Sequence, residues 1–116
     1  MRLKWGPVLI GAGAGFLIGS VVGVAMVGLL PGGTGLDALL VLLSFLIEFG
    51  AGFVAGWLSP GSEALNGSQA ALLLYALASL IALTGGASLL VLIVGAALAL
   101  AIGTMGGILA VALRAD

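Results

Sequence analysis

The sequence contains no cysteine and no histidine, and only 6% of its residues are charged. Without cysteine there is neither a disulfide nor a thiolate, and without histidine the usual metal ligand and the usual general base are missing. Three basic and four acidic residues form no basic patch, which speaks against nucleic-acid binding. We therefore expect no metal site, no cofactor, no nucleic-acid partner and no enzymatic activity.

Apolar residues dominate instead, since hydrophobic residues make up 63% of the 116 positions and 21 more are glycine. Small residues spread through apolar segments are typical of closely packed transmembrane helices. The apolar segments cover about residues 6–30, 36–58, 68–86 and 88–112. Each is long enough to cross roughly 30 Å of hydrocarbon at 1.5 Å per residue, the third only just. The sequence therefore predicts an all-α integral membrane protein, a single domain over residues 1–116 that forms a bundle of four transmembrane helices in a lipid bilayer.

Residues that break helices separate the four segments. Thr34 and Asp37 have the spacing of a capping box at the start of the second helix. Between residues 59 and 68 we expect a short interfacial turn of helix, which Asn66-Gly67 ends before the third span begins. The three turn sequences are Pro31-Gly32-Gly33, Ser59-Pro60-Gly61 and Gly85-Gly86.

The basic residues indicate the orientation of the chain. Arg2, Lys4 and Arg114 all lie near its ends. Because basic residues accumulate on the cytoplasmic side of a membrane, we expect both termini in the cytoplasm and an even number of spans between them. Trp5 and Trp57 then fall at the same headgroup level, which tryptophan favours. The protein is expected to be a multi-pass protein of a prokaryotic inner membrane.

Glycines recur at four-residue spacing in three of the predicted helices. Such ladders allow another helix backbone to approach closely, and they are most regular in the first and fourth helices, which we expect to pack most closely. The partner helix could belong to this chain, to a second copy or to another protein. The helix-packing positions are Gly11, Gly15, Gly19 and Gly23 in the first helix, Gly52 and Gly56 in the second, and Gly95, Gly103 and Gly107 in the fourth.

Glu48 is the only acidic residue deep inside an apolar run, about 15 Å from the end of its helix at Leu58. No basic residue lies inside any span, so we expect the carboxyl group to be neutral, because an ionised one costs several kcal/mol in hydrocarbon. It is either a proton or cation site or a neutral acid that fixes helix register by hydrogen bonds. The candidate partners in a polar layer at its depth are Ser44, Tyr75, Ser79 and Thr104.

Beside the face of Glu48, an aromatic stripe runs along the same helix at four-residue spacing: Phe45, Phe49, Phe53 and Trp57. Such a stripe could line a pocket for a lipophilic ligand. More often it is a surface for packing or for contact with lipid.

Two stretches carry a resemblance to known proteins: GAGFVAGW at the end of the second helix and IGTMGGILAVAL near the C-terminus. Over Glu48 to Leu113 the chain resembles a group of small four-helix prokaryotic membrane proteins of uncharacterised function. The resemblance rests on glycine patterns, and it implies the architecture but no activity.

Two functions fit these patterns. The first is a structural or accessory membrane protein that packs with itself, or with a larger membrane complex, through its glycine-ladder faces. The alternative is a small oligomeric transporter or channel in which Glu48 is the proton- or cation-linked residue. A transporter needs an accessible path to Glu48, whereas an accessory subunit needs a hydrogen-bonded carboxyl group and an outward face of small residues.

Overall fold

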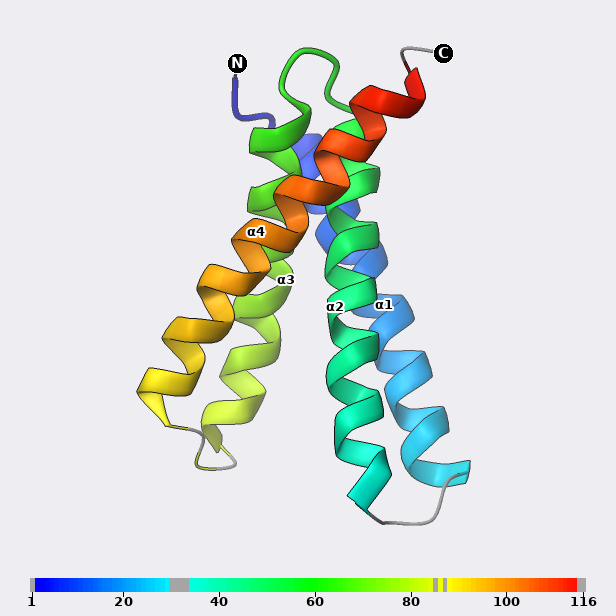
Figure 1. The fold of residues 1–116 in the computed structure, drawn as a ribbon, viewed down its shortest axis with the longest axis vertical. Coiled ribbons are helices and arrows are strands. Elements are labelled where there is room, and N and C mark those ends of the chain that lie inside the picture. The colour runs from blue at the N-terminus through cyan, green and yellow to red at the C-terminus, as the bar shows by residue number, and fades with distance from the viewer. Residues whose placement is uncertain (1, 30–33, 85, 87, 115–116) are drawn as a thin grey trace.

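The computed structural model describes residues 2–29, 34–84, 86 and 88–114, of which the side chains of residues 34, 36–38 and 82 are left out. The described chain folds into four α-helices (Figure 1): α1 (Trp5–Leu29), α2 (Thr34–Trp57), α3 (Glu63–Thr84) and α4 (Leu89–Arg114). All four are long and apolar enough to cross a membrane. The prediction of an all-α, four-helix membrane protein is thereby confirmed. The predicted stop at 31–33 and the predicted capping pair of Thr34 and Asp37 lie outside the described residues and side chains.

The start of α3 differs from the sequence prediction. The helix begins at Glu63 and continues through Asn66-Gly67, where we expected a stop. A hydrogen-bonded bend at Ser59–Ser62 precedes it, with Gly61 at a positive φ of 86°. Gly67 stays helical because α2 and α4 pack against it where no side chain fits, so that tertiary contact outweighs its low intrinsic helix propensity. The predicted short interfacial turn is therefore the first turn of α3.

The helices form two pairs, α1 with α2 and α3 with α4, which meet near the end that carries both termini and separate toward the opposite end (Figure 1). The central helices α2 and α3 each contact all three of the others, whereas α1 and α4 do not contact each other in the described part of the chain. The two helices with the most regular glycine ladders therefore pack against the central helices, not against one another.

Three helices meet at what we call the glycine junction, formed by Gly52 of α2, Gly67 of α3 and Gly103 of α4. A Cβ atom built on Gly67 would lie 2.6 Å from the carbonyl oxygen of Gly103 and 2.8 Å from that of Gly52. Such spacing leaves no room for a side chain, so the three backbones are in direct contact. Gly107 continues this contact toward the termini, where it lies against the backbone of Glu63 in α3.

Contacts along the ladder of α1 weaken with distance from the termini. A Cβ atom on Gly11 would lie 2.6 Å from the carbonyl oxygen of Ala51, and one on Gly15 would lie 2.8 Å from the side chain of Leu74. At Gly19 the nearest such contact is 3.5 Å, and at Gly23 no described atom lies within 4 Å. The small residues of α1 therefore pack against α2 and α3 at one end and leave open space at the other.

Polar residues tie the helices together at the end that carries the termini. The guanidinium group of Arg114 forms an ion pair with Glu63 at 2.5 Å and donates hydrogen bonds to the carbonyl oxygens of Gly56 and Trp57. It also lies 5.1 Å from the centre of the Trp57 ring. One side chain at the end of α4 thus bonds the Trp57 carbonyl at the end of α2, and adds a second bond to the Gly56 carbonyl, which already accepts from the N–H of Ser59.

The buried side chain of Asn66 fixes the N-terminal segment. Its Oδ1 accepts a hydrogen bond from the backbone N–H of Lys4 at 2.7 Å, and its Nδ2 donates to the carbonyl oxygens of Arg2 and Ser62, each at 3.0 Å. The backbone N–H of Arg2 in turn donates to Ser62 Oγ at 2.7 Å. All donors and acceptors of this buried amide except one lone pair are used, which keeps its burial from destabilising the fold.

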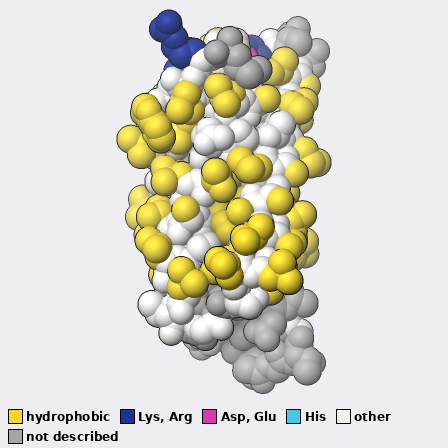
Figure 2. Space-filling view, turned by 90° about the vertical axis from the view of Figure 1, so that its left-hand side faces the viewer, with side chains coloured by type: hydrophobic (Ala, Val, Ile, Leu, Met, Phe, Trp, Pro, Cys, Tyr) yellow, Lys and Arg dark blue, Asp and Glu magenta, His cyan; other side chains and the backbone are white. Residues whose placement is uncertain are grey.

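The outer surface fits a lipid environment. Figure 2 shows hydrophobic side chains along the length of one face and basic side chains gathered at one end. Large apolar side chains such as Leu17, Val24 and Leu90 are more than two-thirds exposed, a state that lipid tolerates and water does not. The four spans and this surface define a multi-pass membrane protein.

Candidate functional site

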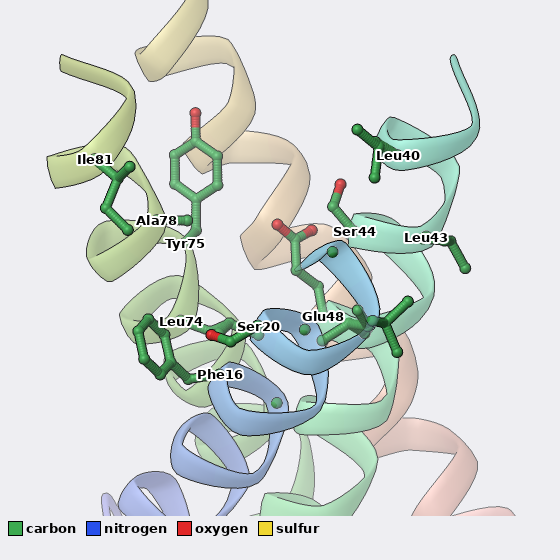
Figure 3. Close-up of a pocket in the computed structure, with 15 residues that line it drawn as sticks. Phe16, Ser20, Leu40, Leu43, Ser44, Glu48, Leu74, Tyr75, Ala78 and Ile81 are labelled. Carbon is green, nitrogen blue, oxygen red and sulfur yellow. The ribbon is translucent and has the colours of Figure 1, made fainter. Parts of the chain in front are cut away.

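A cavity of about 260 Å³ lies between α1, α2 and α3, where the two helix pairs begin to separate. Most of its wall is apolar. Figure 3 shows Leu40 and Leu43 of α2, Leu74 and Ile81 of α3, and Phe16 of α1 around it. Its polar lining residues are Ser20, Ser44, Glu48 and Tyr75.

The shape of α1 explains why the cavity is there. Gly15, Gly19 and Gly23 all line it, yet only Gly15 is in tight contact with a neighbouring helix. Because the two later glycines carry no side chains and α2 and α3 diverge at their level, nothing from the described chain fills the space. The same ladder that allows close packing near the termini leaves a hollow further along the helix.

Glu48 points from α2 into this cavity (Figure 3). Its side chain is only 6% exposed, and its Oε2 has no hydrogen-bond partner among the described residues. Buried polar atoms are nearly always hydrogen-bonded, and an unpaired one costs about 1–3 kcal/mol. A ligand with a group that bonds Oε2 would therefore remove this cost.

The hydroxyl groups predicted to form a polar layer with Glu48 bond elsewhere. Ser44 donates to the carbonyl oxygen of Val41 in its own helix, at 2.7 Å. Tyr75 donates across the helix pair to the carbonyl oxygen of Leu92 in α4, at 2.9 Å. Of the predicted partners, Ser44 and Tyr75 line the cavity together with Glu48, but neither is bonded to it.

The two other predicted partners lie away from the cavity lining. Ser79 donates to the carbonyl oxygen of Tyr75 at 2.8 Å, and Thr104 donates to that of Leu100 at 2.7 Å. Serine and threonine inside apolar helices commonly bond a carbonyl one turn back in their own helix. That local bond is available to each of them without any contact between helices.

Gly95, expected to serve a helix ladder, serves a different contact. A Cβ atom there would collide with the hydroxyl group and ring of Tyr75. The missing side chain in α4 is what allows the Tyr75 ring to reach across from α3. This contact holds α3 and α4 together beside the cavity.

The aromatic stripe does not line the cavity. Phe53 and Trp57 instead stack on each other, with ring centres 5.8 Å apart, near the end that carries the termini. The aromatic rings of the cavity come from Phe16 and Tyr75, on two other helices. The stripe lies on the neighbouring face of α2, and therefore points away from the direction in which Glu48 projects.

Sequence reasoning missed the contribution of α1. Phe16 and Ser20, one helical turn apart, both line the cavity. Ser20 is the only hydroxyl-bearing residue in the first span, and this was the available signal. Counted from the tryptophan ends, Ser20 lies 15 residues from Trp5 and Glu48 lies nine residues from Trp57, so depth alone gave no reason to group them.

The donor set limits the chemistry of the site. Among the described residues there is no group of three or more acidic, cysteine or histidine side chains that could hold a metal ion. The cavity therefore offers one carboxyl group, three hydroxyl groups and apolar walls. Such a site can exchange a proton or pair with one positive charge.

Comparisons with protein-family models, with curated proteins and with solved structures find no match. The cavity and Glu48 therefore carry the functional argument.

Proposed function

We propose that this chain is a small membrane transporter in which Glu48 is the proton- or cation-linked residue. The observation that supports it is the buried, unpartnered carboxyl oxygen of Glu48 facing a cavity in the middle of the bundle. Acidic residues within membrane spans generally mark ion or substrate pathways. An acid that only fixed helix register would be expected to bond a neighbouring helix, and the nearby hydroxyl groups bond backbone carbonyls instead.

The arrangement of the helices supports the same proposal. The two helix pairs are in backbone contact at the glycine junction and apart at the opposite end. A cavity between two such pairs changes its access when the angle between them changes, which is how many membrane transporters expose a central site to alternate sides.

Proton flux into lipid vesicles tests this function. Wild-type protein should collapse an imposed pH gradient, as followed by an enclosed pH-sensitive dye, and Glu48→Gln should not, since the amide keeps the shape but cannot exchange a proton. Glu63→Gln makes the same change at an acid outside the cavity and should retain flux. Equal flux through wild type and Glu48→Gln would refute the assignment of Glu48.

A second candidate is the accessory role, in which a helix of a second copy or of a larger membrane complex occupies the cavity. Gly23 favours it, because a Cβ atom on this lining residue would meet no atom of the described chain within 4 Å and the position would accept a close helix. Purification from the native membrane in mild detergent should then yield a complex of fixed stoichiometry, which Gly23→Leu disrupts. Gly13→Leu, on an open face of the same helix, is the control and should leave the complex intact.

We also propose that the end carrying both termini faces the cytoplasm of a prokaryotic cell. Arg2, Lys4 and Arg114 lie at that end and support this orientation. The natural chain lacks cysteine, so single cysteines at exposed Pro60 and Ser88, at opposite ends, can be labelled separately. Labelling of Ser88→Cys in intact cells by a membrane-impermeant reagent, with Pro60→Cys protected, is expected; the reverse pattern would invert the orientation.

A further inference from the structure

We propose that the ligand of the Glu48 cavity is an organic cation with a single positive charge and an apolar body. This proposal rests on the proposed function, because it names the substrate class of the same site. It follows from three features of the cavity: its one acid, its few free oxygen ligands and its apolar and aromatic walls.

The first feature is charge. Among the described residues that line the cavity, Glu48 is the only one with a carboxyl group, so these residues can neutralise one positive charge. A second charge on the ligand would remain unpaired in a low-dielectric interior, at a cost of several kcal/mol. The unpartnered Oε2 marks the point at which the cationic group would sit.

The second feature argues against an inorganic ion. Calcium takes six to eight oxygen ligands, and magnesium needs a nearly complete octahedral shell. Here the described lining supplies at most five side-chain oxygens, two from Glu48 and one each from Ser20, Ser44 and Tyr75, and only one carboxyl group. A bare metal ion would lose far more hydration than this site replaces.

The third feature is the wall itself. Leucine and isoleucine side chains from α2 and α3 line the cavity that the carboxyl group faces, and Phe16 and Tyr75 add aromatic rings (Figure 3). Aromatic faces attract organic cations, and apolar walls favour a ligand that buries hydrocarbon. The volume of about 260 Å³ admits a small organic molecule.

Proton balance links this ligand to the proposed transport. With no basic residue among the described residues that line the cavity, the empty site holds a neutral carboxyl group. A cation that pairs with the carboxylate must therefore displace its proton, so that one proton leaves for each ligand bound. Binding and proton release occur at the same atoms.

Binding of two isosteric probes to the protein in lipid nanodiscs tests the proposal. Benzyltrimethylammonium carries the charge, and neopentylbenzene is its neutral counterpart with carbon in place of nitrogen. Broadening of the ligand methyl signal in NMR titrations, corrected with empty nanodiscs, gives both affinities. Wild-type protein should bind the cation at least tenfold more tightly and release about one proton per cation.

Three variants separate the contributions. Glu48→Gln should abolish the preference for the cation and the proton release, whereas Glu63→Gln should keep both. Phe16→Leu should weaken the cation at least threefold and leave the neutral compound unchanged. Displacement of the cation by equimolar sodium or magnesium, or an unchanged preference in Glu48→Gln, would overturn the proposal. Circular dichroism of each variant identifies any that fails to fold. If Glu48→Gln fails to fold, the effect of Phe16→Leu on the two affinities decides whether the proposal stands.

The outcome is distinguishable from that of the proton-flux experiment. Glu48-dependent flux without any preference for the cation would overturn this proposal and leave the transport function intact. Glu48-dependent cation binding in a protein that moves no protons, even with benzyltrimethylammonium present on one side of the vesicle membrane, would support the ligand class and overturn transport.

Discussion

Replacing Gly103 with alanine adds one methyl group at the point where α2, α3 and α4 meet. The new Cβ atom would lie 2.5 Å from the carbonyl oxygen of Gly67 and 2.5 Å from the Cβ atom of Ala71. It would also lie 3.1 Å from the Cα atom of Ser68. None of these atoms can rotate away, because they belong to backbone or to the first side-chain carbon.

The magnitude follows from these distances. Ordinary contact begins at 3.4 Å, so α3 and α4 would have to separate by roughly 1 Å. Overpacking of a tight interior typically costs about 1–3 kcal/mol. Alanine gains about 0.5–1 kcal/mol over glycine in a helix. The expected result for Gly103→Ala is a net destabilisation of about 1–2 kcal/mol.

Gly13 supplies a matched control, because a Cβ atom on it would meet nothing within 4 Å. Gly13→Ala should therefore stabilise the protein by up to about 1 kcal/mol through helix propensity alone. Reversible unfolding by sodium dodecyl sulfate in mixed micelles, followed by far-ultraviolet circular dichroism, measures both variants against wild type. A Gly103→Ala protein as stable as Gly13→Ala would mean that the backbones of α3 and α4 are not in contact at Gly103.

Two further substitutions test the polar end of the bundle. Asn66→Leu should cost about 1–3 kcal/mol and speed amide exchange at Lys4, since it leaves the Lys4 N–H and the Arg2 carbonyl without this partner; unchanged exchange in NMR spectra would contradict the contact. Arg114→Lys keeps the charge but loses the planar group that reaches both Glu63 and the α2 carbonyls. The free energy of unfolding should therefore fall by about 1 kcal/mol. A double-mutant cycle with Glu63→Gln that shows no coupling would contradict the ion pair.

The helices were predictable because their signals are local. Each span carries a long apolar run, and three of the four helices begin within a few residues of the expected positions. At the start of α4, Ser88 accepts a hydrogen bond from the N–H of Val91 at 3.2 Å, as an N-cap residue does.

The exception at α3 has a physical reason. Asn66-Gly67 has the composition of a helix end, but its role is set by segments distant in sequence. The amide of Asn66 bonds residues 2 and 4, and Gly67 accommodates α2 and α4. No window of the sequence around residue 66 contains those partners.

Part of the site was predictable because its main signal is also local in sequence. Glu48 stood out because a charged residue inside an apolar run is rare. Its surroundings did not, because depth alone cannot say which face of a neighbouring helix turns inward. Ser79 and Thr104 have suitable depths but bond within their own helices, whereas Phe16 was brought to the cavity by the divergence of the helix pairs.

The lack of contact between α1 and α4 in the described chain has a consequence for biogenesis. The hairpin of α1 and α2 contains the contacts of Gly11 with Ala51, so it can assemble in the membrane while the ribosome is still synthesising the second half. The glycine junction needs Gly103, which lies in α4 and is synthesised after the three other helices. Until α4 is made, Gly52 of α2 and Gly67 of α3 lack the helix that packs against them. Lipid or a membrane insertase must then cover the faces of α2 and α3 that carry these glycines.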